Sequence, residues 1–110
     1  MTAQMAVIHS DLFSGAGIVA GGPYACVQSV MTGDLLAALQ ICVYDKPTGK
    51  IDIEALKQFT QQSFADGKIA DPKNLKDMPV WIYSGILDSV VLPPVVDKSS
   101  QQFTAFDSKV

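Results

Sequence analysis

Arginine is absent from this sequence, so all eight of its Lys and Arg residues are lysines. Arginine is the residue best suited to bidentate contacts with phosphate groups. The lysines are scattered and form no basic stripe, and the net charge is -3 at pH 7. We therefore expect no nucleic acid as a partner, and nothing in the sequence indicates an anionic membrane surface as a partner.

A long apolar run is also missing. The apolar segment 15–22 is far shorter than the roughly 20 residues that a membrane-spanning helix needs. No basic residue precedes the first apolar stretch, which is not the pattern of a secretory signal peptide. If Met1 is the natural start, these absences predict a chain without a signal peptide that stays in the cytoplasm.

Cysteine and histidine are scarce, with two cysteines and one histidine. Cys26 and Cys42 with the distant His9 do not make a zinc site, and we expect no metal and no cofactor. The residues alone leave two alternatives open. The cysteines are buried free thiols, or they form a disulfide that closes a short loop and adds about 3 kcal/mol of stability. The second alternative implies an oxidising compartment.

The composition is that of a globular protein, with 48% hydrophobic and 17% charged residues. We expect one domain over residues 1–110. Short apolar runs predict strands at 16–20 and 80–84. Helical segments alternate with these strands, which predicts an α/β fold with parallel strands and a right-handed crossover. Two strands with open edges are too few for a sheet of this class, so we expect a partial fold.

Helices are expected in four stretches. Residues 4–12 are compatible with a helix, Asp34 and Asp52 can cap helices at 34–42 and 52–66, and Pro93-Pro94 can open the last one. Residues 71–79 read as a connecting loop between two prolines. Ile53, Leu56, Phe59 and Phe64 give the helix at 52–66 an apolar face, and Trp81 on the second strand is expected in the core. The apolar residues of the other two capped or proline-started helices are Leu35, Leu36, Leu39, Ile41, Val95, Val96, Phe103 and Phe106.

Asp88 is the strongest candidate for a chemical role. It follows the strand at 80–84 through Gly85, Ile86 and Leu87, and ligands of open α/β sheets gather at the carboxyl ends of the strands. An aspartate there can orient a histidine and stabilise the imidazolium that forms during acyl transfer. By position alone, an exposed loop aspartate or a helix cap is the favoured alternative.

Three separated motifs resemble the poly(3-hydroxybutyrate) depolymerase-type esterases. The first is Gln4-Met5-Ala6 with residues 10–15, which is similar to the nucleophile helix of that family. The second is Gly-Ala-Gly-Ile-Val-Ala-Gly-Gly-Pro-Tyr-Ala-Cys at 15–26, similar to the strand and loop that follow it. The third, residues 69–75 and 80–91, resembles the acid-bearing segment. The motifs occur in the family's order and together cover nearly the whole chain.

The resemblance implies part of an α/β-hydrolase fold with a Ser-Asp-His triad, and it places the triad acid on Asp88. It pairs Cys26 with Cys42 in a disulfide. It also implies an extracellular or periplasmic complete enzyme that acts on a polyester or on short-chain hydroxyalkanoate esters. Two alternatives stay open for Tyr24, which either lines a substrate cleft or packs against the disulfide.

The chain departs from this family at the nucleophile and at the base. No G-x-S-x-G elbow occurs, and the resemblance places that elbow at or just before Met1-Thr2-Ala3. No histidine follows Asp88, and His9 reads as a surface or packing residue. Nor do Ser10, Ser84 and Ser89 have a plausible base and oxyanion donors beside them. We expect a truncated segment, inactive alone, or alternatively a non-catalytic protein that forms homo-oligomers or binds a partner.

Overall fold

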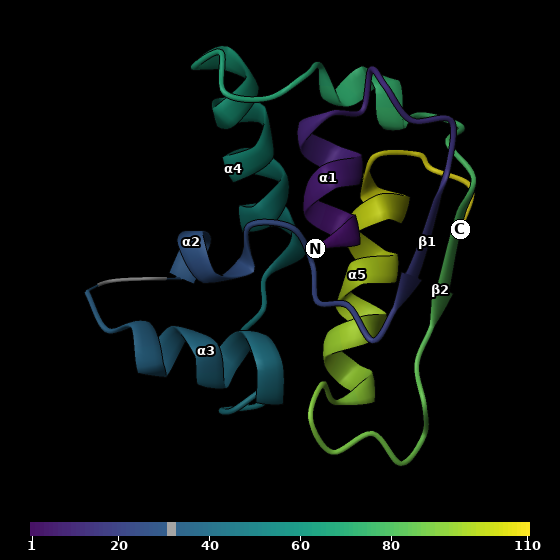
Figure 1. Ribbon diagram of the computed structural model, residues 1–110. Helices are drawn as coiled ribbons and strands as arrows, with labels where there is room; N and C mark the ends of the chain where they lie inside the picture. Colours follow the sequence, from purple (N-terminus) through teal and green to yellow (C-terminus); the bar gives the residue numbers. More distant parts are fainter. Residues whose placement is uncertain (31–32) are drawn as a thin grey trace.

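The computed structural model describes residues 1–30 and 33–110 as a mixed α/β fold (Figure 1). Seven of its elements are ordinary helices and strands, and one is a short 3-10 helix, η1. In chain order they are α1 (Thr2–Ile8), β1 (Ala16–Val19), α2 (Cys26–Val30), α3 (Leu35–Tyr44), α4 (Ile53–Ala65), η1 (Pro72–Leu75), β2 (Val80–Tyr83) and α5 (Pro93–Ala105).

The strands β1 and β2 pair in parallel, with Ile18 opposite Ile82. Alternate residues point to opposite faces of the sheet. The inner face, which includes Ile18 and Val80, is buried against α1 and α5, and both of these helices lie on the same side of the sheet (Figure 1). The sequence-based prediction of an α/β fold with two parallel strands and flanking helices is therefore confirmed.

Two hydrophobic clusters form the core. The first fills the space between the sheet and its helices and is built from Ala3, Ala6, Val7, Ile18, Tyr24, Ala25, Leu75, Met78, Val80, Phe103 and Phe106. The second gathers around the cysteines, with Ile51, Leu56 and Val95. Since α4 and α5 contribute to both clusters, they join the helices at one end of the molecule to the layer that covers the sheet.

The helix caps proposed from the sequence are in place. The side chain of Asp34 accepts hydrogen bonds from the backbone of Leu36 and Ala37 at the start of α3. Asp52 does the same for Glu54 and Ala55 at the start of α4. These bonds satisfy backbone N–H groups that have no partner within the helix.

Several element boundaries predicted from the sequence were wrong. The first helix ends at Ile8 rather than continuing to residue 12, because the Ile8 carbonyl accepts a hydrogen bond from Ala70, far along the chain. The helix α2 was not predicted at all. The segment 71–79 is not wholly a loop, since it contains η1 with the Asp71 side chain as its cap.

The outer face of the sheet is largely uncovered, which also differs from expectation. The Trp81 side chain is 61% exposed, and it stacks on Tyr83 with ring centroids 5.9 Å apart. Both are accompanied by the exposed Val19 of β1. The assignment of Trp81 to the core was therefore wrong, because the helices α1 and α5 cover only the other face. Phe64, predicted on the apolar face of the helix at 52–66, is also exposed, and so are Leu35, Leu36 and Leu39 of α3.

The C-terminal residues lie against the second edge of β2. Lys109 forms a parallel bridge with Pro79, supported by bonds from the Val80 amide to the Lys109 carbonyl (2.8 Å) and from the Lys109 amide to the Met78 carbonyl (2.9 Å). The amide of Ala16 in β1 bonds instead to the Pro79 carbonyl on the opposite side. Within the described residues, β2 is thus paired on both sides at its start.

Candidate functional site

A cleft of about 410 Å³ lies where β1 ends and α1 begins. Three segments of the chain form its walls: the first residues of α1, the end of β1 with the loop that follows, and the two disulfide-bonded segments. They contribute Met1, Thr2, Ala3, Gln4, Ile18, Val19, Ala20, Gly21, Gly22, Pro23, Cys26, Val27, Gln28, Cys42 and Val43. The cleft therefore occupies the carboxyl edge of the sheet, where ligands of α/β folds bind.

The loop after β1 turns sharply to form one wall of this cleft. Ala20 has a positive φ of 50°, a conformation that costs energy for a residue with a side chain. Its amide bonds to the Tyr83 carbonyl at 2.9 Å, which ties the turn to β2. At the next position, a Cβ on Gly21 would lie 2.5 Å from Cγ2 of Ile18. Only glycine therefore fits at position 21 without displacing a core side chain.

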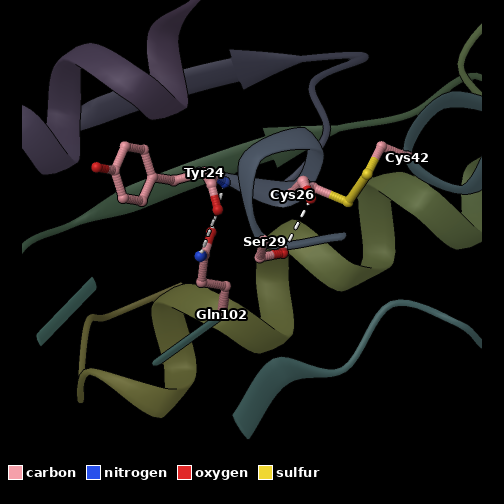
Figure 2. The surroundings of a disulfide bond; sticks show 5 residues. All are labelled: Tyr24, Cys26, Ser29, Cys42 and Gln102. Carbon is pink, nitrogen blue, oxygen red and sulfur yellow. Dashed lines mark hydrogen bonds between the residues drawn. A yellow bond between two sulfur atoms is a disulfide. The ribbon is translucent and has the colours of Figure 1, made fainter. Parts of the chain in front are cut away.

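Cys26 and Cys42 form a disulfide bond, with their Cα atoms 5.9 Å apart (Figure 2). The bond joins the start of α2 to α3, and both cysteines are buried. The Ser29 hydroxyl donates a hydrogen bond to the Cys26 carbonyl at 2.9 Å (Figure 2). The disulfide thus links the two short helices that flank the cleft on the side away from α1.

A long loop leads from the carboxyl end of β2 to α5 (Figure 1), and this loop carries Asp88 between Tyr83 and Pro93. The Oδ1 atom of Asp88 accepts hydrogen bonds from the backbone amides of Val90 (2.8 Å) and Val91 (3.1 Å). Within the described residues, Oδ2 forms no hydrogen bond. The carboxylate is therefore fixed in orientation through one oxygen, while the other is available to an N–H donor.

The loop that carries Asp88 is anchored near the disulfide. The Val91 side chain packs against the cluster that contains Cys26 and Cys42. The Leu92 amide lies 3.4 Å from the Val43 carbonyl, next to the bridged cysteine. The position of the Asp88 carboxylate thus depends on packing around the disulfide.

Tyr24 is buried, with 6% of its surface exposed, and its side chain belongs to the first core cluster. Its ring points away from the disulfide (Figure 2). Burial raises the pKa of its hydroxyl, and a hydrogen bond with the Ser63 side chain partly opposes that shift. The side chain is placed for packing beside α1 and α5, and Tyr24 is not among the residues that line the cleft.

The remaining polar candidates lie apart from one another. His9 is exposed at the C-terminal end of α1, roughly 8 Å along the helix axis from the residues that line the cleft. The Gln4 side chain lies on the cleft wall, and its Oε1 is buried without a hydrogen-bond partner in the described structure. The Ser84 hydroxyl, directly after β2, is likewise buried without a hydrogen-bond partner in the described structure. The motif at 4–6 had given Gln4 no role in binding.

No metal centre is apparent in residues 1–30 and 33–110, where no three His, Cys, Asp or Glu side chains gather as possible ligands. Among the helices of the same residues, none combines the length and the apolar character needed to cross a membrane. The described residues offer a cleft and, in the loop after β2, one oriented carboxylate, although no residue of that loop is among those that line the cleft.

Two curated relatives match this chain along almost its entire length. A poly(3-hydroxybutyrate) depolymerase of Delftia acidovorans is 35% identical over 107 residues, which cover 96% of this chain and 20% of the relative. A polyhydroxybutyrate depolymerase of Talaromyces funiculosus is 28% identical over 115 residues, covering 98% of this chain and 29% of the relative. The chain therefore spans less than a third of the length of either relative.

No family model matches the chain, and no solved structure matches it. The relation to known proteins consequently depends on the two depolymerases, which match 96% and 98% of this chain. This chain is homologous, over nearly its whole length, to a part of the poly(3-hydroxybutyrate) depolymerases.

Proposed function

We propose that this chain is the acid-bearing segment of a serine esterase that hydrolyses short-chain hydroxyalkanoate esters. The observation that carries the proposal is the geometry of Asp88. Its carboxylate is held by two backbone amides at the carboxyl end of β2, and the cleft opens at the carboxyl end of the neighbouring strand β1. The homology supports the reaction class, because both relatives are named as depolymerases of polyhydroxybutyrate.

Asp88 takes the role of the triad acid in this proposal. Its free Oδ2 accepts the N–H of a histidine, fixes the tautomer of the imidazole, and stabilises the imidazolium that forms when the serine attacks the ester. The resemblance implies that the serine elbow and the histidine come from parts of the enzyme outside these 110 residues. The chain itself supplies the acid and the walls of the cleft.

The substrate proposed for the complete enzyme is a polyester or a short ester of the same hydroxyacid. The cleft walls combine apolar side chains, including Ile18 and Val43, with the glycine-rich loop and the Gln4 side chain. Such walls suit an ester, which has an apolar chain and carbonyl acceptors but no charge. An extracellular or periplasmic location is proposed with it, because the Cys26–Cys42 bond persists best in an oxidising compartment.

The purified chain alone is expected to hydrolyse p-nitrophenyl butyrate no faster than buffer. Its sequence holds no G-x-S-x-G nucleophile and no histidine after Asp88, and loss of triad members removes most of the rate enhancement. A chromogenic assay under saturating ester, with heat-denatured chain as the blank, measures this. Saturable hydrolysis by a preparation free of host esterases would contradict the expectation.

The complementary experiment places the chain in an enzyme that brings the missing groups. In the Delftia chimaera, residues 1–110 replace the stretch of the Delftia acidovorans depolymerase that is aligned with this chain. We expect the chimaera to hydrolyse poly(3-hydroxybutyrate) films and p-nitrophenyl butyrate. A folded chimaera that is inactive, beside an active parent depolymerase, would count against the proposed function.

A second candidate function is a non-catalytic protein that associates with its own copies. The observation that favours it is the uncovered outer sheet face, where Val19, Trp81 and Tyr83 are 64%, 61% and 53% exposed. Apolar patches of this kind on a soluble domain mark contact surfaces. In this reading two copies cover each other's sheet.

We expect the isolated chain to form dimers or larger oligomers that depend on this face. Replacing Trp81 and Tyr83 together by serine removes the stacked aromatic pair and should shift the chain toward monomer. Light scattering coupled to size exclusion, under non-reducing conditions, measures the mass. The matched control is Leu36→Ser, since Leu36 is 68% exposed on α3, outside the sheet. A monomeric unmodified chain would exclude self-association through this face.

A further inference from the structure

The loop of residues 21–24 contributes Gly21, Gly22 and Pro23 to a wall of the cleft, and α5 holds this loop by hydrogen bonds. The Ser99 hydroxyl donates a hydrogen bond to the Gly21 carbonyl at 2.6 Å. Gln102 holds both backbone groups of Tyr24, accepting from its amide at 2.7 Å and donating to its carbonyl at 3.0 Å (Figure 2). Three hydrogen bonds from one helix therefore fix both ends of this loop.

These two polar side chains are fully inside the protein. Ser99 is 0% and Gln102 is 1% exposed, and their helix neighbours Val95, Val96 and Phe103 are buried apolar residues. A buried amide or hydroxyl is costly unless its groups are hydrogen-bonded. Packing alone would be served better by apolar residues at these positions. Their polar groups are therefore explained by the loop that they hold.

The spacing of Ser99 and Gln102 along α5 lets both side chains reach the same loop. Residues 99 and 102 are three apart, so they lie on the same face of α5. Between their two contacts stand Gly22 and Pro23, which line the cleft. The same helix starts at Pro93, directly after the loop that carries Asp88. One helix thus connects the oriented carboxylate to the wall of the cleft.

We propose that Gln102, assisted by Ser99, is a positioning residue that sets the shape of the cleft wall at residues 21–23. The identification of the cleft with an ester-binding site rests on the proposed function, whereas the positioning itself rests on the hydrogen bonds. Gln102 acts through the loop and does not reach the cleft, since it is not among the residues that line it.

Amide exchange and NMR shifts of the intact chain test this proposal. Gln102→Met keeps the approximate volume of the side chain but removes both hydrogen bonds to Tyr24. We expect the exchange of the Tyr24 amide to accelerate by about tenfold or more, since a buried N–H loses its acceptor. Ser99→Ala should instead shift the ¹⁵N resonance of Gly22, whose nitrogen shares a peptide unit with the Gly21 carbonyl, and leave the Tyr24 amide nearly unchanged.

The matched control is Thr60→Val on α4. Thr60 is also fully buried, but the one hydrogen bond of its hydroxyl among the described residues goes to the Leu56 carbonyl within its own helix. A merely structural role for Gln102 predicts that Gln102→Met and Thr60→Val speed exchange alike throughout the core. Equal effects, or an unchanged Tyr24 amide in Gln102→Met, would overturn the proposal. Because no ester and no turnover are involved, the esterase proposal can fail without affecting this result.

Discussion

Asp88→Asn in the Delftia chimaera is expected to lower kcat roughly 10³- to 10⁴-fold, because the amide cannot hold the histidine in the tautomer that accepts the serine proton. Asparagine can still accept the Val90 and Val91 amides through its own Oδ1. The loop should therefore keep its conformation, and the loss should be one of chemistry. Steady-state hydrolysis of p-nitrophenyl butyrate by equal amounts of folded protein measures the effect.

The matched control for this substitution is Asp97→Asn. Asp97 is an exposed aspartate on α5 whose carboxylate accepts a hydrogen bond from the Gln101 side chain. The substitution changes the net charge by the same amount as Asp88→Asn, and Asp97 lies outside the cleft. Activity within about twofold of the parent chimaera is expected for the control. If Asp88→Asn retained similar activity, Asp88 would be only the cap of its loop, and the triad acid would have to be sought elsewhere.

Removal of the disulfide is expected to lower the free energy of unfolding by about 3 kcal/mol, the value for a loop of this length in the chain-entropy model. The loop in question is closed by residues 16 apart in sequence. The Cys26→Ser/Cys42→Ser double variant should therefore unfold at a lower urea concentration, with a similar m-value. Urea titration followed by far-ultraviolet circular dichroism, which reports the loss of the helices, measures this.

The same variant should loosen the loop that carries Asp88. Val91 packs against the disulfide cluster, and the Leu92 amide bonds to the Val43 carbonyl. Exchange of the Val90 and Val91 amides is therefore expected to accelerate together with the loss of stability. The control is a reductant, which should shift the unmodified chain toward the double variant and leave the double variant unchanged. A reductant without effect on the unmodified chain would contradict the expected stabilisation.

Local sequence signals were sufficient for the elements that depend on near neighbours. Asp34 and Asp52 cap the third and fourth helices because their side chains bond to amides two and three residues away. The two strands begin at Ala16 and Val80 as their apolar runs predict. The relation to the depolymerases was also readable, because its motifs are contiguous stretches of sequence.

Exposure could not be read in the same way. Trp81 has the residue type and the setting of a buried strand residue, yet it is 61% exposed. Which face of a strand is covered depends on where distant helices pack. Both α1 and α5 pack on the sheet face opposite to the Trp81 side chain. The end of the first helix is a similar case, since the partner of the Ile8 carbonyl is Ala70.

The sequence by itself thus determined the α/β class, the capped helices, the position of Asp88 after the second strand, and the homology to a part of the poly(3-hydroxybutyrate) depolymerases. The tertiary structure alone revealed the orientation of the Asp88 carboxylate, the burial of Tyr24, and the hydrogen bonds between Gln102 and the backbone of Tyr24. The physical reason is distance along the chain. Gln102 and Tyr24 are separated by 78 residues. The sequence around either residue gives no sign of the other, because their contact forms only when α5 packs against the loop.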